Sequence, residues 1–394
     1  FKQKTAYEML RSLVGSEMCI RDRPYAFNIG RCTPRAFPMG NRPYICLSIT
    51  LKRLSMNYML KNENSIYYEC GYSCDNALYI RLGSEAFFIT DSRYTIDAKE
   101  NVKDAKVVIN GDLYGEALKI LKKSKVKKVI FDPKEWTVAG FEKLSSKSKV
   151  TFKAELDLSH KKRIIKSDKE LKILSKAAKL GAKAFKKLAK EFRENGFAED
   201  EFTLTHRAKT ILSGFGKYEL SFDPIVAINA SAAKPHATPT DTKLSKNDLL
   251  LVDAGLKYKR YCSDRTRTVQ ADKHFTFNTD QKFKRKKIQK AYDTVLKAHD
   301  HAIKKARSGM KAKKVDALTR DIISKAGFGE YYVHSTGHGV GLDIHEMPYI
   351  STKSDTIIED GMVYTIEPGI YIPNEFGIRI EDMVAMVDGK AVVL

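Results

Sequence analysis

The sequence is poor in the residues and patterns that mark several special classes of protein. Its 394 residues include one tryptophan, 11 prolines and six cysteines. No apolar run approaches the roughly 18 residues that a membrane helix needs. The cysteines are too few and too irregularly spaced for a disulfide framework or a zinc site in so long a chain. We therefore expect a globular, cytoplasmic protein that does not enter a membrane.

Positive charge is abundant but spread along the chain. The formal net charge is +22 at pH 7, and a field of that sign attracts polyanions whatever the fold. The lysines nevertheless lie along helical segments such as 282–290 and 304–314, and they are not interleaved with aromatic residues in one stretch. We interpret them as a solvated surface and expect no nucleic-acid partner, with a binding role as the alternative.

Residues 1–55 differ from the rest of the sequence. They carry ten basic and three acidic residues, show no sustained hydrophobic period, and lack the apolar run of a signal peptide. Patterned sequence begins at Met56. We expect residues 1–55 to be disordered or a non-native leader without function.

Residues 56–160 show short apolar runs that alternate with a lysine-rich helical stretch, which is typical of an α/β layer. We expect one small α/β domain here, which begins with a hairpin whose turn is Gly83-Ser84-Glu85. The predicted strands are 65–68, 77–82, 86–90, 106–109 and 128–131, and the predicted helix is 114–122.

Residues 161–394 are predicted to form an α+β domain. Ser167 and Glu170 form a capping box, and the apolar spacing that follows predicts a long helix that ends at Gly196. Further helices are expected at about 199–213, 280–307 and 312–326, and strands at 249–254, 363–367 and 383–387.

Two aspartates in this domain are candidate metal ligands. Asp253 lies in the apolar run LLLVDAG, and Asp264 follows eleven residues later in YCSDRTRT, a spacing that allows two neighbouring antiparallel strands to bring them together. A buried carboxylate without a partner is costly. Asp253 is therefore expected either to bind a metal or to pair with Arg265 or Arg267.

Three histidines lie close together in HSTGHGVGLDIHE. His338 is at the centre, glycines surround it, and His334 and His345 flank it. Glycines allow the backbone to approach a ligand closely. A structural role is common for a single histidine, but the cluster favours metal binding or acid–base chemistry.

Two more carboxylates lie in otherwise apolar strands, Glu367 in YTIEPGIY and Glu381 in GIRIEDMV, where pairing of Glu381 with Arg379 is the alternative to metal binding. Together with the two aspartates and His338 they form an oxygen-rich set that suits Mn²⁺, Co²⁺ or Fe²⁺. Two ions about 3.5–4 Å apart can share a water and polarise a scissile carbonyl, which indicates hydrolysis.

The five candidate ligands, in this order and in these local sequences, resemble the metal-ligand set of the pita-bread metallopeptidase family. That family includes methionine aminopeptidase, aminopeptidase P, prolidase and creatinase. Residues 72–94 also resemble the amino-terminal domain of its proline-directed members. The resemblance implies a small creatinase-type α/β domain before a pita-bread domain, and two divalent ions held by Asp253, Asp264, His338, Glu367 and Glu381.

The resemblance also implies roles for other residues. His236, in NASAAKPHATP, matches a histidine that contacts substrate and stabilises the transition state, and His345 matches one that hydrogen-bonds substrate near the scissile bond. Glu367 is implied as a proton shuttle and Arg379 as an arginine near the second ion. His334 matches a histidine of the pocket on the proline side.

One residue departs from the family pattern. Arg260 stands before Tyr261 where a glycine is usual, in the loop after Asp253, and we expect it to touch no ligand.

The implied activity is hydrolysis of the bond before proline, whose amide carries no N–H. An Xaa-Pro aminopeptidase is the first expectation, a dipeptidase that accepts only dipeptides is the alternative, and a non-catalytic pita-bread binding protein remains a third reading. The implied cofactors are two Mn²⁺ ions, with Co²⁺, Fe²⁺ or Zn²⁺ as alternatives. The implied partners are proline-containing peptides and a second copy of the chain in a homodimer.

Overall fold

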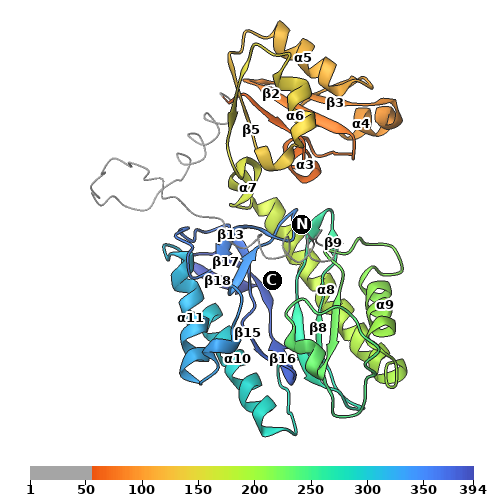
Figure 1. Ribbon diagram of the computed structural model, residues 1–394, viewed down its shortest axis with the longest axis vertical. Coiled ribbons are helices and arrows are strands. Elements are labelled where there is room, and N and C mark those ends of the chain that lie inside the picture. Colours follow the sequence, from red (N-terminus) through yellow and green to blue (C-terminus); the bar gives the residue numbers. More distant parts are fainter. Residues whose placement is uncertain (1–55) are drawn as a thin grey trace, which may run out of the picture. The chain divides into compact units, whose positions relative to one another are not determined.

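The computed structural model describes residues 56–394 (Figure 1). The expectation for residues 1–55 lies outside the described residues. Within residues 56–394, no helix combines the length and the apolar character that crossing a membrane requires.

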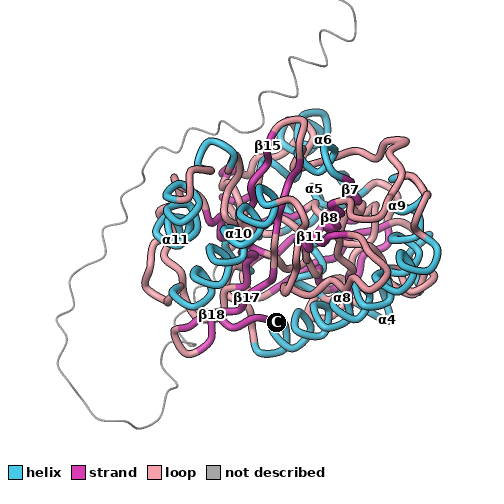
Figure 2. Tube along the Cα trace, turned by 90° about the horizontal axis from the view of Figure 1, so that it is seen from below, coloured by secondary structure: helices cyan, strands magenta, loops and turns pink. Residues whose placement is uncertain are grey.

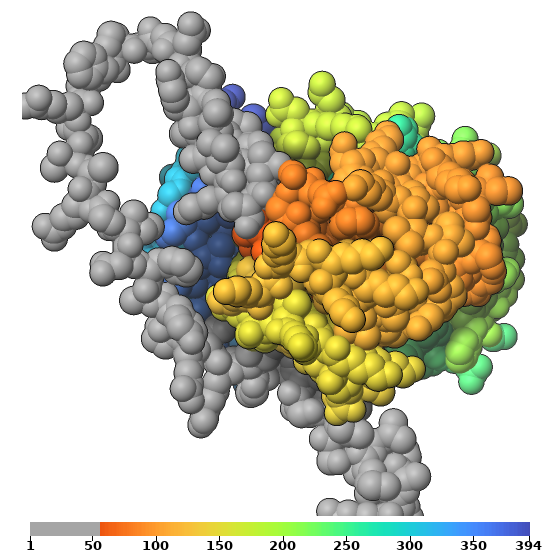
Figure 3. All heavy atoms as spheres, turned by 90° about the horizontal axis from the view of Figure 1, so that it is seen from above, coloured from red at the N-terminus to blue at the C-terminus, as the bar shows by residue number. Residues whose placement is uncertain are grey.

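A six-stranded mixed sheet forms the first domain, which Figure 3 shows in orange to yellow. Its strand order is β4-β3-β2-β1-β5-β6, with antiparallel pairing of β1 with β2 and β2 with β3, and parallel pairing elsewhere. The strands are β1 Tyr58–Leu60, β2 Ala77–Leu82, β3 Glu85–Thr90, β4 Lys106–Ile109, β5 Lys128–Phe131 and β6 Thr151–Ala154, and the helices are α3 Glu63–Cys70, α4 Thr95–Asn101, α5 Leu113–Lys123 and α6 Val138–Ser145.

Most predicted elements of this domain are confirmed, but residues 65–68 are helical and the prediction of a strand there is wrong. The side chain of Asn62 accepts hydrogen bonds from the backbone N–H groups of Asn64 and Ser65 and so caps α3. Ile66 and Cys70, four residues apart, turn one face of α3 into the core. The cap and this helical spacing outweigh the strand propensity of the intervening tyrosines.

The predicted hairpin is confirmed with a shorter turn. Glu85 pairs with Leu82, so Gly83 and Ser84 alone connect β2 to β3. Gly83 has a φ of 61°, which glycine adopts without strain.

A short helix, α7 (Leu158–Arg163), leads into the second domain. The capping box at Ser167 and Glu170 is present, and the long helix ends at Asn195 before Gly196, as predicted. The other three predicted helices and all three predicted strands are also present. The helices are α8 Asp168–Asn195, α9 Glu201–Leu212, α10 Lys286–Lys305 and α11 Ala312–Lys325.

Two sheets and two hairpins make up the β structure of the second domain. The sheets have the orders β11-β8-β7 and β13-β12-β14-β17-β18, and β9 pairs with β10 as β15 does with β16. The strands are β7 Ile225–Ile228, β8 Leu249–Asp253, β9 Lys257–Tyr258, β10 Tyr261–Cys262, β11 Thr266–Gln270, β12 Gly337–Gly339, β13 Glu346–Ile350, β14 Val363–Ile366, β15 Gly369–Ile372, β16 Phe376–Arg379, β17 Asp382–Val387 and β18 Lys390–Val393.

Strand β8 is apolar on both faces because helices and strands cover both sides of it. Leu250 and Val252 pack in one core with α8 and α9. Leu249 and Leu251 pack in another with α10, β15 and β16. Figure 2 shows α10 and α11 on one side of these strands and α8 and α9 on the other. Because side chains alternate along a strand, Asp253 lies on the Leu251 side, toward the β15–β16 hairpin.

Candidate metal centre

The structure places all five predicted ligands at strand ends or in a short strand of the second domain. Asp253 ends β8, Asp264 lies between β10 and β11, His338 is the middle residue of β12, Glu367 follows β14, and Glu381 precedes β17. Strands β8 and β11 are antiparallel neighbours. Asp253 lies opposite Thr266, and Asp264 lies two residues before Thr266, in the connection that precedes β11. Asp253, Asp264 and Glu381 are buried, and His338 and Glu367 are partly buried, the most exposed of the five side chains being Glu367 at 15%.

Three of these residues are close enough to hold one ion. Asp264, His338 and Glu381 each offer a donor atom, and these atoms lie within 4.8 Å of one another. Nε2 of His338 also lies 3.3 Å from Oε1 of Glu367 and 3.5 Å from Oδ2 of Asp264. Nδ1 of His338 lies 3.1 Å from the carbonyl oxygen of Gly339. A proton on Nδ1 that is donated to this carbonyl leaves the lone pair of Nε2 toward the carboxylates.

Asp253 joins the cluster through one free oxygen. Arg379 donates from Nη2 to Oδ2 of Asp253 at 2.6 Å. Oδ1 of Asp253 is buried and has no hydrogen-bond partner within residues 56–394. A buried carboxylate oxygen that accepts no hydrogen bond is available to bind a metal ion.

The sequence offered two ion pairs as alternatives to metal binding, Asp253 with Arg265 or Arg267 and Glu381 with Arg379, and neither prediction is confirmed. Arg265 and Arg267 contact Asp382, at 3.2 and 2.8 Å. Arg379 pairs with Asp253, while Oε2 of Glu381 accepts from the hydroxyl of Thr266 at 2.5 Å. In the described part of the chain, basic side chains therefore balance little of the negative charge of the cluster.

The cluster shifts the pKa values of its own members. Burial and the neighbouring charges of Asp253 and Glu367 raise the pKa of Asp264 well above its usual value. Burial, followed by the charges of Asp264 and Glu367, does the same to the pKa of Glu381. Burial raises the pKa of Glu367 to about 8, with Asp253 adding to the shift and Arg379 opposing it. Each shift means that positive charge at this place, from protons or from a metal ion, lowers the free energy.

The histidine in the cluster is kept neutral. Burial, followed by the positive charge of His345, lowers the pKa of His338 to about 3. A neutral imidazole is the form that binds metal. The donor set, four carboxylates and one neutral imidazole around an unpartnered oxygen, fits two divalent cations and has the oxygen-rich character of Mn²⁺, Co²⁺ or Fe²⁺ sites.

Tyr371, which sequence analysis did not identify, connects two of the predicted site residues. Its hydroxyl accepts from Nη1 of Arg379 at 2.7 Å and lies 2.8 Å from Nε2 of His334. Burial, followed by the charge of Arg379, lowers the pKa of His334 to about 3. The sequence signal was weak because Tyr371 sits in an apolar strand. Only the β15–β16 pairing brings it near Arg379.

The two remaining predicted residues are exposed, unlike the ligands. His236 and His345 both reach solvent. The ring of His345 lies 4.3 Å from the ring of His338, centroid to centroid, in an edge-on arrangement. Partial burial, followed by the charge of His236, lowers the pKa of His345. These two imidazoles are therefore next to the cluster but open to a ligand that arrives from solvent.

Arg260 touches none of the ligands, as expected, and lies at the tip of the β9–β10 hairpin. Its φ is 69°, the left-handed region that favours the glycine usual at this position. Its guanidinium lies 4.8 Å from the ring centre of Tyr67 and 3.5 Å from Oε2 of Glu63, both in α3.

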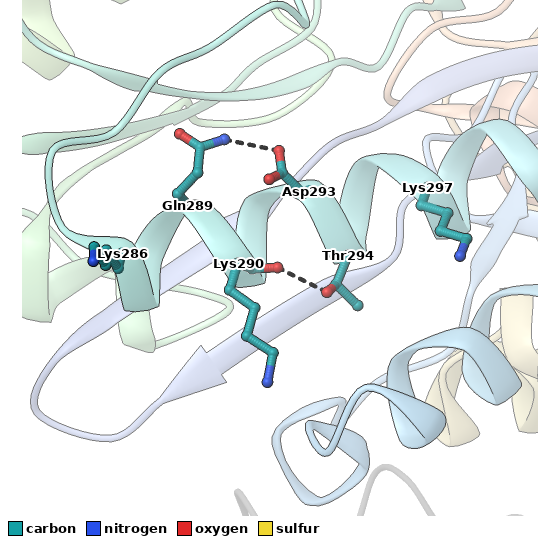
Figure 4. A pocket seen from close by; sticks show the side chains of 6 residues that line it. All are labelled: Lys286, Gln289, Lys290, Asp293, Thr294 and Lys297. Carbon is teal, nitrogen blue, oxygen red and sulfur yellow. Dashed lines mark hydrogen bonds between the residues drawn. The ribbon is translucent and has the colours of Figure 1, made fainter.

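A separate hollow on α10 has none of this chemistry (Figure 4). All of its lining residues come from one helix, and two hydrogen bonds there join α10 to itself, from Gln289 to Asp293 and from Thr294 to the carbonyl of Lys290. The lining residues are Lys286, Gln289, Lys290, Asp293, Thr294 and Lys297.

The architecture is thus a small α/β domain followed by a domain with a cluster of carboxylates and an imidazole that could hold metal ions. Residues 172–388 match Metallopeptidase family M24, and residues 52–164 match the Creatinase/Prolidase N-terminal domain. The chain belongs to metallopeptidase family M24, and it has the pita-bread fold with a creatinase-type amino-terminal domain that the sequence predicted.

Relatives of known name are similar over most of their length. An Xaa-Pro dipeptidase of Pyrococcus horikoshii is 34% identical over 328 residues, which cover 82% of this chain and 88% of that protein. The solved structure of an Xaa-Pro dipeptidase from Bacillus anthracis has a TM-score of 0.79 and 30% identity, and covers 88% of this chain and 95% of that one. The structure of an X-Pro aminopeptidase from Thermotoga maritima has a TM-score of 0.77 and 27% identity, and covers 87% of this chain and 97% of that one.

Proposed function

We propose that this protein is an Xaa-Pro peptidase that hydrolyses the peptide bond before proline with the help of two divalent metal ions. The observation that carries the proposal is a largely buried set of four carboxylates and a neutral imidazole, in which the raised pKa values of Asp264, Glu367 and Glu381 call for added positive charge. The proline preference is supported by the names of the relatives that cover most of the chain. The proposed ligands are Asp253, Asp264, His338, Glu367 and Glu381.

When bound, the ions supply positive charge that activates water and polarises the scissile carbonyl. The chain's own residues bind the peptide and move the proton. Glu367, whose Oε1 lies 3.3 Å from Nε2 of His338, is the proposed shuttle: as a carboxylate it would take a proton from the water and give it to the leaving nitrogen of proline. His345 and His236 are exposed beside the cluster and are the proposed donors to substrate oxygens.

Two further residues complete the proposed site. Arg379 holds Asp253 with one nitrogen and the Tyr371 hydroxyl with another, which fixes the orientation of that ligand. His334, on the other side of Tyr371, is the proposed wall of the proline pocket.

A dipeptidase is the first candidate for the length of the substrate, because two relatives that cover most of the chain at 30% identity or more carry that name. This reverses the order expected from sequence. The aminopeptidase remains the second candidate, since an X-Pro aminopeptidase has nearly the same TM-score. The remaining sequence-based expectations stay proposals: Mn²⁺ as the ion, a homodimer, a cytoplasmic location, and division of the chain at residues 56–160 and 161–394.

Hydrolysis of two peptides tests the proposal. Metal-stripped protein receives Mn²⁺, Co²⁺ or Zn²⁺ in turn and is offered Gly-Pro or Arg-Pro-Pro-Gly, with Asp264→Ala as the control. We expect metal-dependent release of the first residue, lost in the control. Cleavage of Gly-Pro alone identifies the dipeptidase, and cleavage of the longer peptide the aminopeptidase. No cleavage of either peptide with any ion contradicts the proposal.

A further inference from the structure

A second cluster of charged side chains lies beside His345 and takes no part in holding metal. Arg163, at the end of α7, and Lys166, just before α8, are 1% and 4% exposed. They face Asp343 and Glu346, which lie on either side of His345 in sequence. Two positive and two negative side chains are thus collected around the segment that carries an exposed histidine of the site.

The contacts of this cluster run from the inter-domain connection to the His345 segment. Nζ of Lys166 donates to Oε1 of Glu346 at 2.6 Å, and both side chains are 1% exposed. Nη2 of Arg163 pairs with Oδ2 of Asp343 and lies 3.3 Å from Oε2 of Glu346. His160, also on α7, lies 2.9 Å from the same oxygen of Asp343.

The first domain adds a further contact from α3. Nδ2 of Asn64 donates to Oδ1 of Asp343 at 2.5 Å and to the carbonyl of Leu342 at 3.1 Å. The segment that carries His345 is therefore held by side chains from both α3 and α7, which lie about 180 to 280 residues earlier in the sequence.

The backbone around His345 is folded closely about the carboxylate of Glu346. The N–H of Gly341 donates to the carbonyl of Asp343 at 3.0 Å. A Cβ at Gly341 would lie 2.4 Å from Oε1 of Glu346, so a side chain there would require the Glu346 carboxylate to move. The Glu346 carboxylate also accepts from the N–H of Asp343 at 3.4 Å, so it contacts the backbone of the segment that carries His345.

The cluster is not arranged for stability alone. Nε and Nη1 of Arg163 are buried and have no hydrogen-bond partner within residues 56–394, while Nη2 alone serves two carboxylates. Unsatisfied buried donors are costly, and buried ion pairs add little stability compared with apolar packing. Departures of this kind concentrate at functional sites.

We infer that Arg163 and Lys166 are positioning residues for His345, and that they act through Asp343 and Glu346. They set the distance between the imidazole of His345 and the metal centre, and the contact from Asn64 adds the first domain to this support. This inference rests on the proposed function for the role of His345, but the geometry that it concerns can be measured without any substrate.

The first test measures kcat for Gly-Pro hydrolysis in Arg163→Met and Lys166→Met. Lys162→Met is the matched control, because Lys162 also lies on α7 but pairs with Glu69 and Tyr58 within the first domain. Misplacement of a catalytic group by 1 Å can cost about 100-fold. We expect kcat to fall at least about tenfold in the two variants, with unchanged metal content, little change in the control, and recovery in Lys166→Arg.

A double-mutant cycle separates positioning from a general structural effect. If Arg163 acts through His345, adding Arg163→Met to His345→Ala lowers kcat no further than His345→Ala alone does. Additive losses of kcat would overturn the inference.

A nuclear magnetic resonance measurement on protein with ¹⁵N-labelled histidine needs no activity. The ring signal of His345 is identified as the one missing from His345→Ala. We expect it to shift in Arg163→Met and Lys166→Met and to stay in place in Lys162→Met. If the signal shifts in the variants but the unsubstituted protein has no peptidase activity, the positioning is supported and the proposed function is contradicted. An unmoved signal in a folded variant overturns the positioning, and Arg163→Lys replaces Arg163→Met if the latter does not fold.

Discussion

Glu381 and Asp382 are adjacent carboxylates with opposite surroundings. Glu381 lies among Asp264, Glu367 and Asp253, and burial together with these charges raises its pKa. Asp382 is also buried, which by itself raises its pKa, but contact with His299 and the charges of Arg267 and Arg265 hold the pKa of Asp382 well below its usual value.

The difference follows from the geometry of a strand and shows how to tell a binding site from a structural ion pair. Successive side chains point to opposite faces, so neighbours in sequence meet different partners. The face of Asp382 supplies two guanidinium groups, whereas the face of Glu381 supplies carboxylates with a neutral imidazole and one guanidinium. Uncompensated negative charge in a buried place indicates a metal centre, and compensated charge indicates structure.

Glu381→Gln is the substitution with the largest expected effect. We expect peptidase activity to fall by more than about 100-fold, because even residues that only support ligands cost about 10–100-fold when changed. Metal-free Glu381→Gln should be at least as stable as the parent, since it loses a charge that repels its neighbours. Metal content by mass spectrometry and thermal unfolding measure the two effects. Lower stability without loss of metal would place Glu381 with Asp382 as a structural residue.

Asp382→Asn should do the reverse. It leaves the buried side chain of Arg267, which is 3% exposed, without its carboxylate. Breaking a buried ion pair costs about 3–5 kcal/mol, and we expect that loss in the free energy of unfolding from urea titration of the metal-free protein. Arg207→Ala, which removes partly exposed ion pairs with Glu191 and Glu199, serves as the control and should cost about 1 kcal/mol or less.

Arg379→Lys tests the guanidinium that pairs with Asp253 among the proposed metal ligands. Arg379 holds Asp253, Tyr371 and Thr266 with three different nitrogens. A lysine ammonium cannot reproduce that planar arrangement. We expect kcat to fall about 10–100-fold with near-normal stability. An unchanged kcat would show that the orientation of Asp253 does not depend on this contact.

The pH dependence of stability tests the same carboxylate cluster without a mutation. The pKa of Glu367 rises from 4.5 to about 8 on folding, so the folded state binds more protons than the unfolded state between these values. The metal-free protein should therefore lose stability as pH rises from about 4.5 to about 8. Added Mn²⁺ should reverse the trend, because the ion replaces the protons. Melting temperatures across this range, with and without Mn²⁺, measure it, and a flat profile without metal would contradict the raised pKa.

Local sequence was sufficient wherever a cap or a strong period determined the element. The capping box at Ser167 and Glu170 predicted α8 to within a residue at both ends. Local sequence failed at residues 65–68, because the run of isoleucine and tyrosine is typical of a strand and the cap from Asn62 is not evident without the structure. The start of α10 was predicted about six residues too early and its end about two residues too late, because charged residues continue the helical pattern beyond Lys286–Lys305.

The sequence by itself predicted the chemistry proposed for the site, because four carboxylates and a histidine in these local sequences resemble the ligand set of a metallopeptidase family. It did not determine which arginine pairs with which carboxylate, nor that Tyr371 joins Arg379 to His334. It also did not reveal that Arg163 and Lys166 meet Asp343 and Glu346. Only the tertiary structure decided these, because such pairings depend on which faces the strands present to one another and on contacts between residues far apart in the chain.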